Sequence, residues 1–498
     1  MNPGILILQF LMPVLIISFS TAQKVLNVPV PYPTIQKAID AAASNDTVIV
    51  APGSYREHID FKTKEITVKS SNGPWVTTIN GNQTTLAVVN LDMAEAVLEG
   101  FTVTGGLGGG VSCDNGAQVR NNIITGNTSA RTGGIHIWSW ARITGNIVSG
   151  NSSTGSNLWS AGGIALAGYR SRSTIIDNIV INNTTSGTGG GITTRGNAHV
   201  TGNVISGNTA LANGGGISVA DSTILYFHGN IVEGNTAWQD GGGIHVEDSY
   251  LEGTSNTLHG NNSALFGGGL AEFNSAVTLV NTLLWDNKAP VGPEAMVSKS
   301  TLGPSVLDIQ YSVVKGGKAS VSVDASSTLV WGLGMATWDP LFVDASRGDL
   351  HLRPDSPCKD TGDGTTKYLL GTDFEGDPRI NGKEVDVGAD EFHPHLYTIG
   401  KATPGGTLLV KAIGAPNDPV FWGVSFNPLL RTPPLPVPGV GSLHLKDPYF
   451  ILSLGALPAN GVITVTVPFP HSFPVPQAFP MQALIGLHLS NVNVVNVR

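Results

Sequence analysis

The central part of the chain, residues 108–287, repeats one pattern of apolar and polar positions. In each repeat, two or three glycines precede an aliphatic residue, and a short run that alternates apolar and polar residues follows. These runs are rich in β-branched residues, as in Ile217-Ser218-Val219, and no helical stripe fits them. The aliphatic position recurs about every 26 residues. Its occupants are Val111, Ile135, Ile164, Ile192, Ile217, Ile244 and Leu270.

Asparagine recurs in step with this pattern at two positions of every repeat. The first series is Asn122, Asn146, Asn178, Asn203, Asn230, Asn256 and Asn281, and the second is Asn127, Asn151, Asn183, Asn208, Asn235, Asn261 and Asn287. An asparagine amide can bond the equivalent amide one repeat above and below it. Asparagine also tolerates the left-handed backbone of a tight corner.

Such a period predicts stacked supersecondary units. A coil of about 26 residues holds two or three short strands joined by turns. Stacking the coils places each strand about 4.8 Å from its equivalent in the next coil. We therefore predict an all-β fold built on a parallel β-helix of about 12 coils with a dry interior. Glycine is expected at a corner of each coil, where φ can be positive.

These repeats resemble those of the right-handed parallel β-helices of the pectin lyase-like superfamily. The phrase GNxAxxxGGGI is similar to large secreted bacterial proteins of that class. The resemblance implies a right-handed coil but no single activity, because this fold hosts lyases, hydrolases, esterases, adhesins and inert stalks. The run from Pro52 to Glu57 is similar to the opening of pectinesterases. The catalytic signatures of pectinesterases, polygalacturonases and pectate lyases have no match in the sequence.

Composition narrows the functional class. The chain has 63 glycines and only 13% charged residues, and its net charge is 27 − 36 = −9. This balance predicts a soluble chain and excludes binding to nucleic acid or to an anionic membrane surface. Two cysteines, Cys113 and Cys358, do not make a disulfide framework. We do not expect them to pair, because one lies early in the repeats and the other lies after them.

The first 22 residues are typical of a signal peptide. An apolar run from Ile5 to Phe19 precedes small residues at the expected cleavage position. The run is short for a membrane span, and no second candidate span follows. The mature chain is therefore expected to be secreted or attached to the cell surface, and the resemblance of the repeats implies that the cell is bacterial.

Three further parts are predicted. Residues 23–345 form the β-helix, which starts with a short capping helix after Thr34. This helix covers strand edges that would otherwise be open. Residues 346–392 form an acidic segment. Residues 393–498 are rich in proline and alternate strands with turns, so we expect a small β-sandwich that serves in sorting or attachment.

The acidic segment resembles the C-terminal segment of β-helix proteins known as "choice-of-anchor Q" proteins, which implies that it closes the β-helix. Its oxygen-rich loops are suited to Ca²⁺, although the spacing is not that of an EF-hand and Asp-Gly pairs also serve as plain turns. The candidate Ca²⁺ ligands are Asp360, Asp363, Asp373 and Asp377.

Alternation predicts which side chains of the repeats face outwards, if the aliphatic residue after the glycines faces inwards. The first outward series is then Ser112, His136, Ala165, Thr193, Ser218, His245 and Ala271. The second outward series is Asp114, Trp138, Ala167, Arg195, Ala220, Glu247 and Phe273. Glu272 falls in the inward series, which requires either a shift of register or a partner for its carboxylate.

The second outward series carries the candidate catalytic residues. A hydrolase needs two carboxylates about 5 to 9.5 Å apart, and Asp221 lies one coil from Glu247 and Asp248. A lyase needs a base, and Arg195 could serve only with a strongly lowered pKa, which is difficult for arginine. The plain alternative is that these charges keep an exposed strand face soluble.

Candidate sugar contacts come from the aromatic residues and one histidine near this stripe. They are Trp138, His245, Trp238 and Phe273.

Two functions follow from the sequence. The first is a non-catalytic, secreted or surface-bound, monomeric β-helix protein that binds polysaccharide or a surface partner. The second is a lyase or hydrolase acting on acidic polysaccharide.

Overall fold

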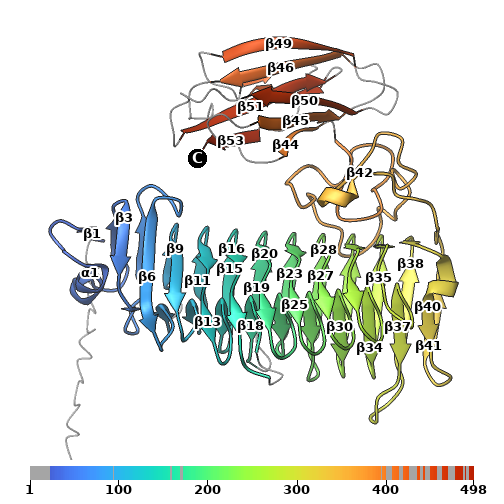
Figure 1. Cartoon of the computed structure of the whole chain (residues 1–498), viewed down its shortest axis with the longest axis horizontal. Coiled ribbons are helices and arrows are strands. Elements are labelled where there is room, and N and C mark those ends of the chain that lie inside the picture. The colour runs from blue at the N-terminus through green and yellow to red at the C-terminus, as the bar shows by residue number, and fades with distance from the viewer. Residues whose placement is uncertain are drawn as a thin grey trace, which may run out of the picture.

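The fold is seen in a computed structural model, which describes residues 23–393 except 93–94, 157–159 and 169–171, together with strands between 395 and 497. The first part is a long parallel β-solenoid whose coils stack from helix α1 at one end to β41 at the other (Figure 1). The predicted signal peptide, residues 1–22, lies outside the described residues.

Three long parallel sheets form the sides of the solenoid. Sheet 1 has 13 strands, from β1 (Val25–Val28) to β41 (Thr328–Trp331). Sheet 2 has 11 strands, from β4 (Ile59–Asp60) to β40 (Val321–Val323), and sheet 3 has 11, from β3 (Gly53–Arg56) to β39 (Val313–Val314). A six-stranded sheet of two-residue strands runs from β13 (Thr128–Ser129) to β33 (Asn262–Ser263).

One coil illustrates the path of the chain. Sheet 2 contributes β30 (Ile244–Glu247), sheet 1 contributes β31 (Tyr250–Thr254) and sheet 3 contributes β32 (Thr257–His259). The next coil begins with β34 (Leu270–Phe273), in which Leu270 pairs with Ile244 in parallel register. The aliphatic positions of the repeats are thus stacked neighbours inside the solenoid. This confirms the predicted β-helix of about 12 coils.

The neighbouring strands of the same sheets have similar bounds. In sheet 2 they are β14 (Ile135–Ile137), β18 (Ile164–Leu166), β22 (Ile192–Thr194), β26 (Ile217–Val219) and β37 (Ala295–Ser298). In sheet 1 they are β27 (Ile224–His228), β35 (Ala276–Val280) and β38 (Val306–Gln310). In sheet 3 they are β28 (Ile231–Glu233) and β36 (Leu283–Trp285).

The asparagine ladders satisfy buried backbone groups at two corners of the coil. Asn208 is fully buried, and its Nδ2 donates to the carbonyl of Val180 at 2.9 Å and to Oδ1 of Asn235 at 3.0 Å. Its own Oδ1 accepts from the backbone N–H and the Nδ2 of Asn183. The side chain of each asparagine therefore bonds backbone groups of the preceding coil and the asparagine of the next coil.

One predicted member of the first ladder is wrong. The position after Asn256 belongs to Thr282, because Thr257 pairs with Leu283 and the residues before them stack. Asn281 turns outwards instead, and its amide bonds both the N–H and the carbonyl of Asp363. The ladder thus ends where a segment from much later in the chain contacts the solenoid.

The glycines fit a turn that folds back on the next strand. Gly241 has φ of 68°, and a Cβ at this position would lie 2.8 Å from Cα and Cβ of His245. A Cβ at Gly242 would meet the backbone of Asn262 at 2.5 Å. Side chains are therefore excluded at both positions for different reasons, one conformational and one steric. The turn also covers the outer face of sheet 2.

This covering contradicts the predicted exposure of the first outward series. Among its members, only Ser112 escapes full burial, and the others are buried under the glycine turns. The buried members are His136, Ala165, Thr193, Ser218, His245 and Ala271. Two polar members bond the turn itself: Thr193 Oγ1 donates to the carbonyl of Thr188 at 2.9 Å, and Nδ1 of His136 lies 2.9 Å from Thr132 Oγ1.

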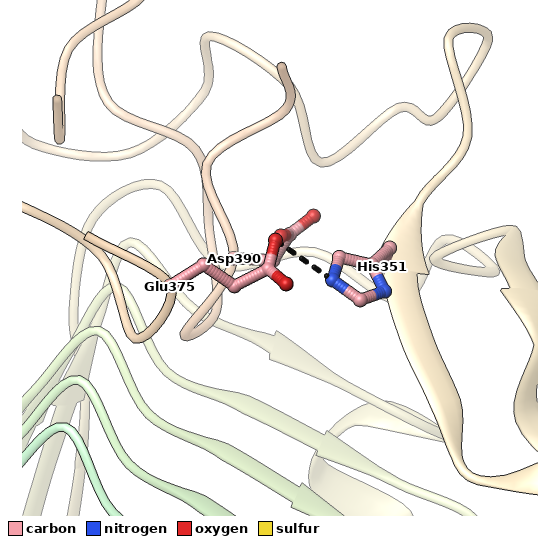
Figure 2. Close-up of side chains that lie close together, drawn as sticks. All are labelled: His351, Glu375 and Asp390. Atoms are coloured by element: carbon pink, nitrogen blue, oxygen red, sulfur yellow. Dashed lines mark ion pairs between the residues drawn. The ribbon is translucent and has the colours of Figure 1, made fainter. Parts of the chain in front are cut away.

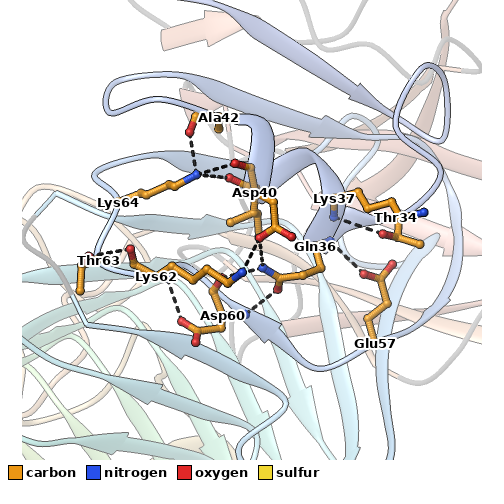
Figure 3. Close-up of polar contacts among 11 residues, drawn as sticks. Thr34, Gln36, Lys37, Asp40, Ala42, Glu57, Asp60, Lys62, Thr63 and Lys64 are labelled. Carbon is orange, nitrogen blue, oxygen red and sulfur yellow. Dashed lines mark hydrogen bonds and ion pairs between the residues drawn. The ribbon is translucent and has the colours of Figure 1, made fainter.

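The capping helix forms where it was predicted. Helix α1 (Ile35–Ala41) begins after Thr34, whose hydroxyl accepts from the N–H of Lys37 at 3.2 Å (Figure 3). The Glu57 carboxylate accepts from the N–H groups of the first two helical residues, Ile35 and Gln36. At the other end, Lys64 Nζ donates to the last carbonyls, so both helix ends are satisfied.

The acidic segment lies along the side of the solenoid. It contains β43 (Asp349–Leu352), which pairs antiparallel with β42 (Phe342–Asp344). Leu350 shares a buried cluster with Ile231 of β28. The N–H of Ala389 donates to Thr257 Oγ1 of β32 at 2.9 Å. The segment therefore packs on the outer face of sheet 3 (Figure 1), and its role in closing the β-helix stays a prediction.

The C-terminal part consists of antiparallel strands. One sheet joins β44 (His395–Ile399), β45 (Thr407–Ile413) and β50 (Val462–Pro468); a second joins β46 (Pro419–Ser425), β49 (Tyr449–Ala456), β51 (Gln477–Ile485), β52 (His488–Leu489) and β53 (Asn493–Val497); and β47 (Leu435–Val437) pairs with β48 (Gly441–Leu443). The all-β character was predicted, and the sandwich arrangement stays a prediction.

Two simpler predictions concern the membrane and the cysteines. Within the described residues, no helix has the length and apolar character needed to cross a membrane. Cys113 and Cys358 are both free and buried. Burial raises the pKa of the Cys358 thiol to about 12, so neither a disulfide nor a reactive thiolate is expected there.

Glu272 is an exception in the apolar interior. The register does not shift around it, because Glu272 stacks between Val246 and Val297. It is fully buried, and both carboxylate oxygens lack a hydrogen-bond partner among the described residues. Burial raises the pKa of Glu272 well above its ordinary value, so the folded chain holds this residue as the neutral acid.

Replacing Asn208 by alanine should lower the free energy of unfolding by about 3 kcal/mol, because it leaves several buried backbone groups without partners. The exposed Asn262, which directly follows the ladder residue Asn261, provides the matched control, and Asn262→Ala should change stability by less than about 0.5 kcal/mol. Urea unfolding followed by circular dichroism measures both. If the two substitutions lowered the free energy of unfolding equally, the stabilising role assigned to the asparagine ladder would be contradicted.

Replacing Glu272 by valine should raise the free energy of unfolding by about 2 kcal/mol near neutral pH. The folded pKa of Glu272 is raised, so its protonated form is retained on folding, and wild-type stability should fall as pH rises above the ordinary glutamate pKa. The advantage of valine should therefore grow with pH. Glu272→Gln, which cannot ionise, should lose this pH dependence. If the free energies of unfolding of the wild type and Glu272→Gln differed by the same amount at every pH, the assignment of Glu272 as a neutral acid would be refuted.

Candidate functional site

The second outward series forms a stripe along the C-terminal ends of the sheet 2 strands. Register places Glu247 beside Phe273. The N–H of Arg195 donates to the carbonyl of Leu166, and the N–H of Ala220 donates to that of Thr194, so these residues continue the stripe. Trp138, at the end of β14, lies five strands from Phe273 in the order of sheet 2, which is about 24 Å.

Arg195 is held in an ion pair with Asp221 from the next coil. The guanidinium is buried, with only 7% of the residue exposed, and Asp221 sits in the left-handed region with φ of 63°. This arrangement gives the arginine a charge partner that keeps it protonated. It is therefore unsuited to act as the base of a lyase. The ion pair also holds the Asp221 carboxylate against the neighbouring coil.

Glu247 and Asp248 differ in their surroundings. Burial raises the pKa of Glu247, and the negative charges of Asp248 and Asp240 raise it further. Asp248 has φ of 49° and occupies the corner that follows β30. Its Oδ1 accepts from Nδ2 of Asn274 at 2.8 Å. Of the three candidate carboxylates, Glu247 alone has the environment of a general acid, while Asp221 and Asp248 are bonded to neighbouring coils.

The candidate sugar contacts do not gather at one place. Trp138 is 44% exposed, and the Arg131 guanidinium lies 5.1 Å from its ring. Trp238 is 62% exposed on the turn after the short strand Thr236–Ala237. His245 is only 3% exposed, and its ring lies 5.6 Å from that of Phe273. The expected exposure of His245 is wrong, because the glycine turn covers it, and burial lowers its pKa to about 4.

A groove of about 530 Å³ lies at the corner that joins sheet 2 to sheet 1. The turns of four successive coils line it, with a polar row at the corner and an apolar row on the first residues of the sheet 1 strands. The lining includes Ser222, Asp248, Tyr250, Asn274, Leu302 and Val306. The apolar row is in register across the coils, with Ile224, Tyr250, Ala276 and Val306 as lateral neighbours.

A hydroxyl ladder forms the base of this corner. The N–H of Thr223 donates to Ser249 Oγ at 3.2 Å, and the N–H of Ser249 donates to Ser275 Oγ at 3.2 Å. The N–H of Ser275 continues the ladder to Ser305 Oγ at 3.1 Å. These bonds fix the corner from coil to coil. This groove was not predicted, because alternation along the sheet 2 strands says nothing about the corner that follows them.

The four aspartates proposed as Ca²⁺ ligands are distributed over three separate turns. Asp360 Oδ1 accepts from the N–H groups of Lys383 and Glu384, and Asp363 Oδ1 accepts from that of Thr365. The remaining two lie in one turn, where Asp373 accepts the N–H of Asp377 at 3.0 Å. In the part of the chain that the structure describes, these four residues do not form a group of converging ligands.

Comparison with known proteins bears on the fold. The sequence model of the family described as "Right handed beta helix region" matches residues 141–284. This match supports the predicted right-handed β-helix for the repeats of the solenoid. No curated protein matches the chain. The resemblance to "choice-of-anchor Q" proteins finds no support in these comparisons and stays a prediction.

Two solved structures are similar to this chain. One is described as the crystal structure of pectate lyase Pel9A; it has a TM-score of 0.47 and 14% identity, and the match covers 75% of this chain and 97% of that chain. The other is the catalytic unit of a thermostable GH87 alpha-1,3-glucanase from Streptomyces thermodiastaticus strain HF3-3. It has a TM-score of 0.35 and 18% identity, with 61% and 66% covered. Likeness of this degree carries no argument about activity.

Arg195→Met should lower the free energy of unfolding by about 2 kcal/mol, because it leaves the partly buried Asp221 carboxylate without its cation. Adding Asp221→Asn should recover more than half of this loss, as a double-mutant cycle in urea measures. Arg142→Met is the matched control, since Arg142 and Glu95 form an exposed pair at 3.6 Å that contributes little. Strictly additive losses in the cycle would contradict the coupling.

Proposed function

We propose that this protein is a secreted or cell-surface β-helix protein that binds a polysaccharide chain without cleaving it. The observation that carries the proposal is the groove at the corner between sheets 2 and 1, which crosses four coils. A linear polymer can follow such a groove across the coils, whereas a compact pocket would suit a small ligand. Export rests on the signal-peptide pattern of residues 1–22.

The chemistry of the groove favours a neutral chain. Its lining contains one carboxylate, Asp248, and neither lysine nor arginine. Tyr250 is 37% exposed and offers an aromatic surface, while Asn274 and Ser222 offer hydrogen-bonding groups beside it. An anionic polysaccharide would meet a negative group and a net charge of −9 without a cation in the lining.

The absence of cleavage is inferred from how the candidate catalytic carboxylates are engaged. Asp221 is paired with Arg195, and Asp248 accepts a hydrogen bond from Asn274. A glycoside hydrolase needs one carboxylate as acid and a second as base or nucleophile, both turned to the substrate. The bonds to neighbouring coils hold these two carboxylates in structural roles.

One observation favours a second function, that of a glycoside hydrolase. Burial and neighbouring negative charges raise the pKa of Glu247, as a general acid requires. Glu247 also lies one residue before Asp248, which lines the groove. In this alternative, Glu247 would protonate the leaving oxygen, and a second carboxylate would have to be released from its present partner.

Tyr250→Ala should weaken retention of the mature chain, residues 23–498, on immobilised neutral glucans and xylan by at least about tenfold, because stacking on the ring is lost. Trp75→Ala, an aromatic 58% exposed on an early coil, should leave retention unchanged. Affinity electrophoresis in gels containing each polymer provides the measurement. Equal retention of both variants would place binding outside the groove.

The same preparations distinguish the two functions. Reducing ends and absorbance of unsaturated products at about 235 nm should stay at background for every polymer, with or without Ca²⁺. Release of products that disappears in Glu247→Gln would establish the hydrolase alternative instead.

A further inference from the structure

Three side chains of the acidic segment converge on one point. They are His351 on β43, Glu375 in the turn after Phe374, and Asp390 near the end of the segment (Figure 2). One potential ligand atom of each lies within 4.8 Å of the others. The Nε2 of His351 and Oε2 of Glu375 are 3.0 Å apart. None of the three belongs to the aspartates singled out from the sequence.

Asp390 is fixed and incompletely satisfied. It is 3% exposed, and its Oδ2 accepts from the N–H of Leu352 at 2.7 Å. Its Oδ1 is buried and has no hydrogen-bond partner within the described ranges. A buried carboxylate oxygen without a partner is costly unless a cation or a donor satisfies it. This oxygen belongs to the residue that faces His351 and Glu375.

His351 is oriented by a fourth residue. Its Nδ1 lies 2.8 Å from Oδ1 of Asp349, two residues earlier on the same strand. With the Nδ1 proton donated to this carboxylate, Nε2 can present its lone pair to an ion on the side of Glu375. A carboxylate that fixes the tautomer of a histidine in this way is the usual companion of a metal-binding imidazole.

We propose that His351, Glu375 and Asp390 form a binding site for a divalent transition-metal ion of the Zn²⁺ type. One imidazole and two carboxylates suit Zn²⁺, whereas Ca²⁺ and Mg²⁺ prefer sites made of oxygen alone. Tetrahedral ligands at zinc distances lie about 3.4 Å apart. The observed separations, from 3.0 Å to within 4.8 Å, are close to this value.

The local charge supports a dication over a simple ion pair. Asp349, Glu375 and Asp390 surround a single imidazole, that of His351. The nearby Arg379 directs its guanidinium to the backbone carbonyls of Asp386, Gly388 and Ala389. A bound dication would place its charge among these three carboxylates.

The site would join three separate stretches of the acidic segment. His351 belongs to the strand that packs on Ile231, and Asp390 follows Ala389, which is bonded to Thr257. Glu375 lies on an exposed turn between them. An ion bound here would fasten the segment against sheet 3, so the proposed role is structural and is independent of the polysaccharide groove.

Calorimetric titration of ZnCl₂ into the EDTA-treated, tag-free mature chain tests this site. We expect one ion per chain with micromolar or tighter affinity and a higher melting temperature in its presence. His351→Gln should abolish the binding. Glu375→Gln, on the exposed rim where folding is least at risk, should weaken it at least tenfold. Asp349→Asn, a positioning residue, should weaken it 10- to 100-fold.

His259→Gln is the matched control. His259 is also buried on sheet 3 and lies 3.7 Å from a carboxylate, that of Glu233, but it has no place in the three-residue group. Its replacement should leave Zn²⁺ affinity unchanged, and CaCl₂ should not compete. Failure to bind Zn²⁺, or binding that survives both His351→Gln and Glu375→Gln in folded protein, would overturn the proposal.

Discussion

The structure depends on one constraint, namely that every coil must present its hydrogen-bonding backbone to the next coil in register. The strands meet this requirement through parallel pairing, but the corners expose backbone groups that point along the solenoid axis. In a dry interior, those groups need partners from the coils themselves. The fully buried Asn208 and its equivalents supply them by bonding backward to a carbonyl and forward to the next amide. The repeat length can vary only in loops that leave these corners in step.

The same constraint decides which surfaces are open to ligands. The glycine turn before each sheet 2 strand folds back closely, as the short distance from Gly241 to His245 shows. Most residues of the outer face of sheet 2 are therefore buried and not open to a ligand. Open surface remains at the corner that follows, where Asp248 and Asn274 adopt the left-handed conformation and project beside the sheet 1 strands.

Local pattern predicted whatever repeats from coil to coil. The ladder positions, the interior aliphatic residues and the helix after Thr34 followed from spacing and side-chain type, because each depends on contacts with the nearest coils. Exposure of His245 was predicted wrongly, since alternation along a strand does not reveal the path of the turn that covers it. The assignment of Asn281 failed because only the pairing of Thr257 with Leu283 identifies Thr282 as the stacked residue.

Contacts between distant segments could not be read from the repeat. His351, Glu375 and Asp390 lie in irregular chain outside the periodic region, and no spacing rule links a strand, a turn and a terminal loop. The binding of this segment to sheet 3 also joins residues more than 100 positions apart, such as Ala389 and Thr257. The acidic, turn-rich composition of the segment is visible in the sequence. Which carboxylates converge is not.

The acidic segment contacts the same coils that form the groove. It packs on Ile231, Thr257 and Leu283, which belong to three successive coils. The corners of those same coils carry Ser222, Asp248 and Asn274, which line the groove. A solenoid is held together only by contacts between neighbouring coils, so it can bend or fray locally. A segment fastened across three coils on one side restrains the spacing of their corners on another. Such restraint lowers the entropy lost when a polymer binds across them.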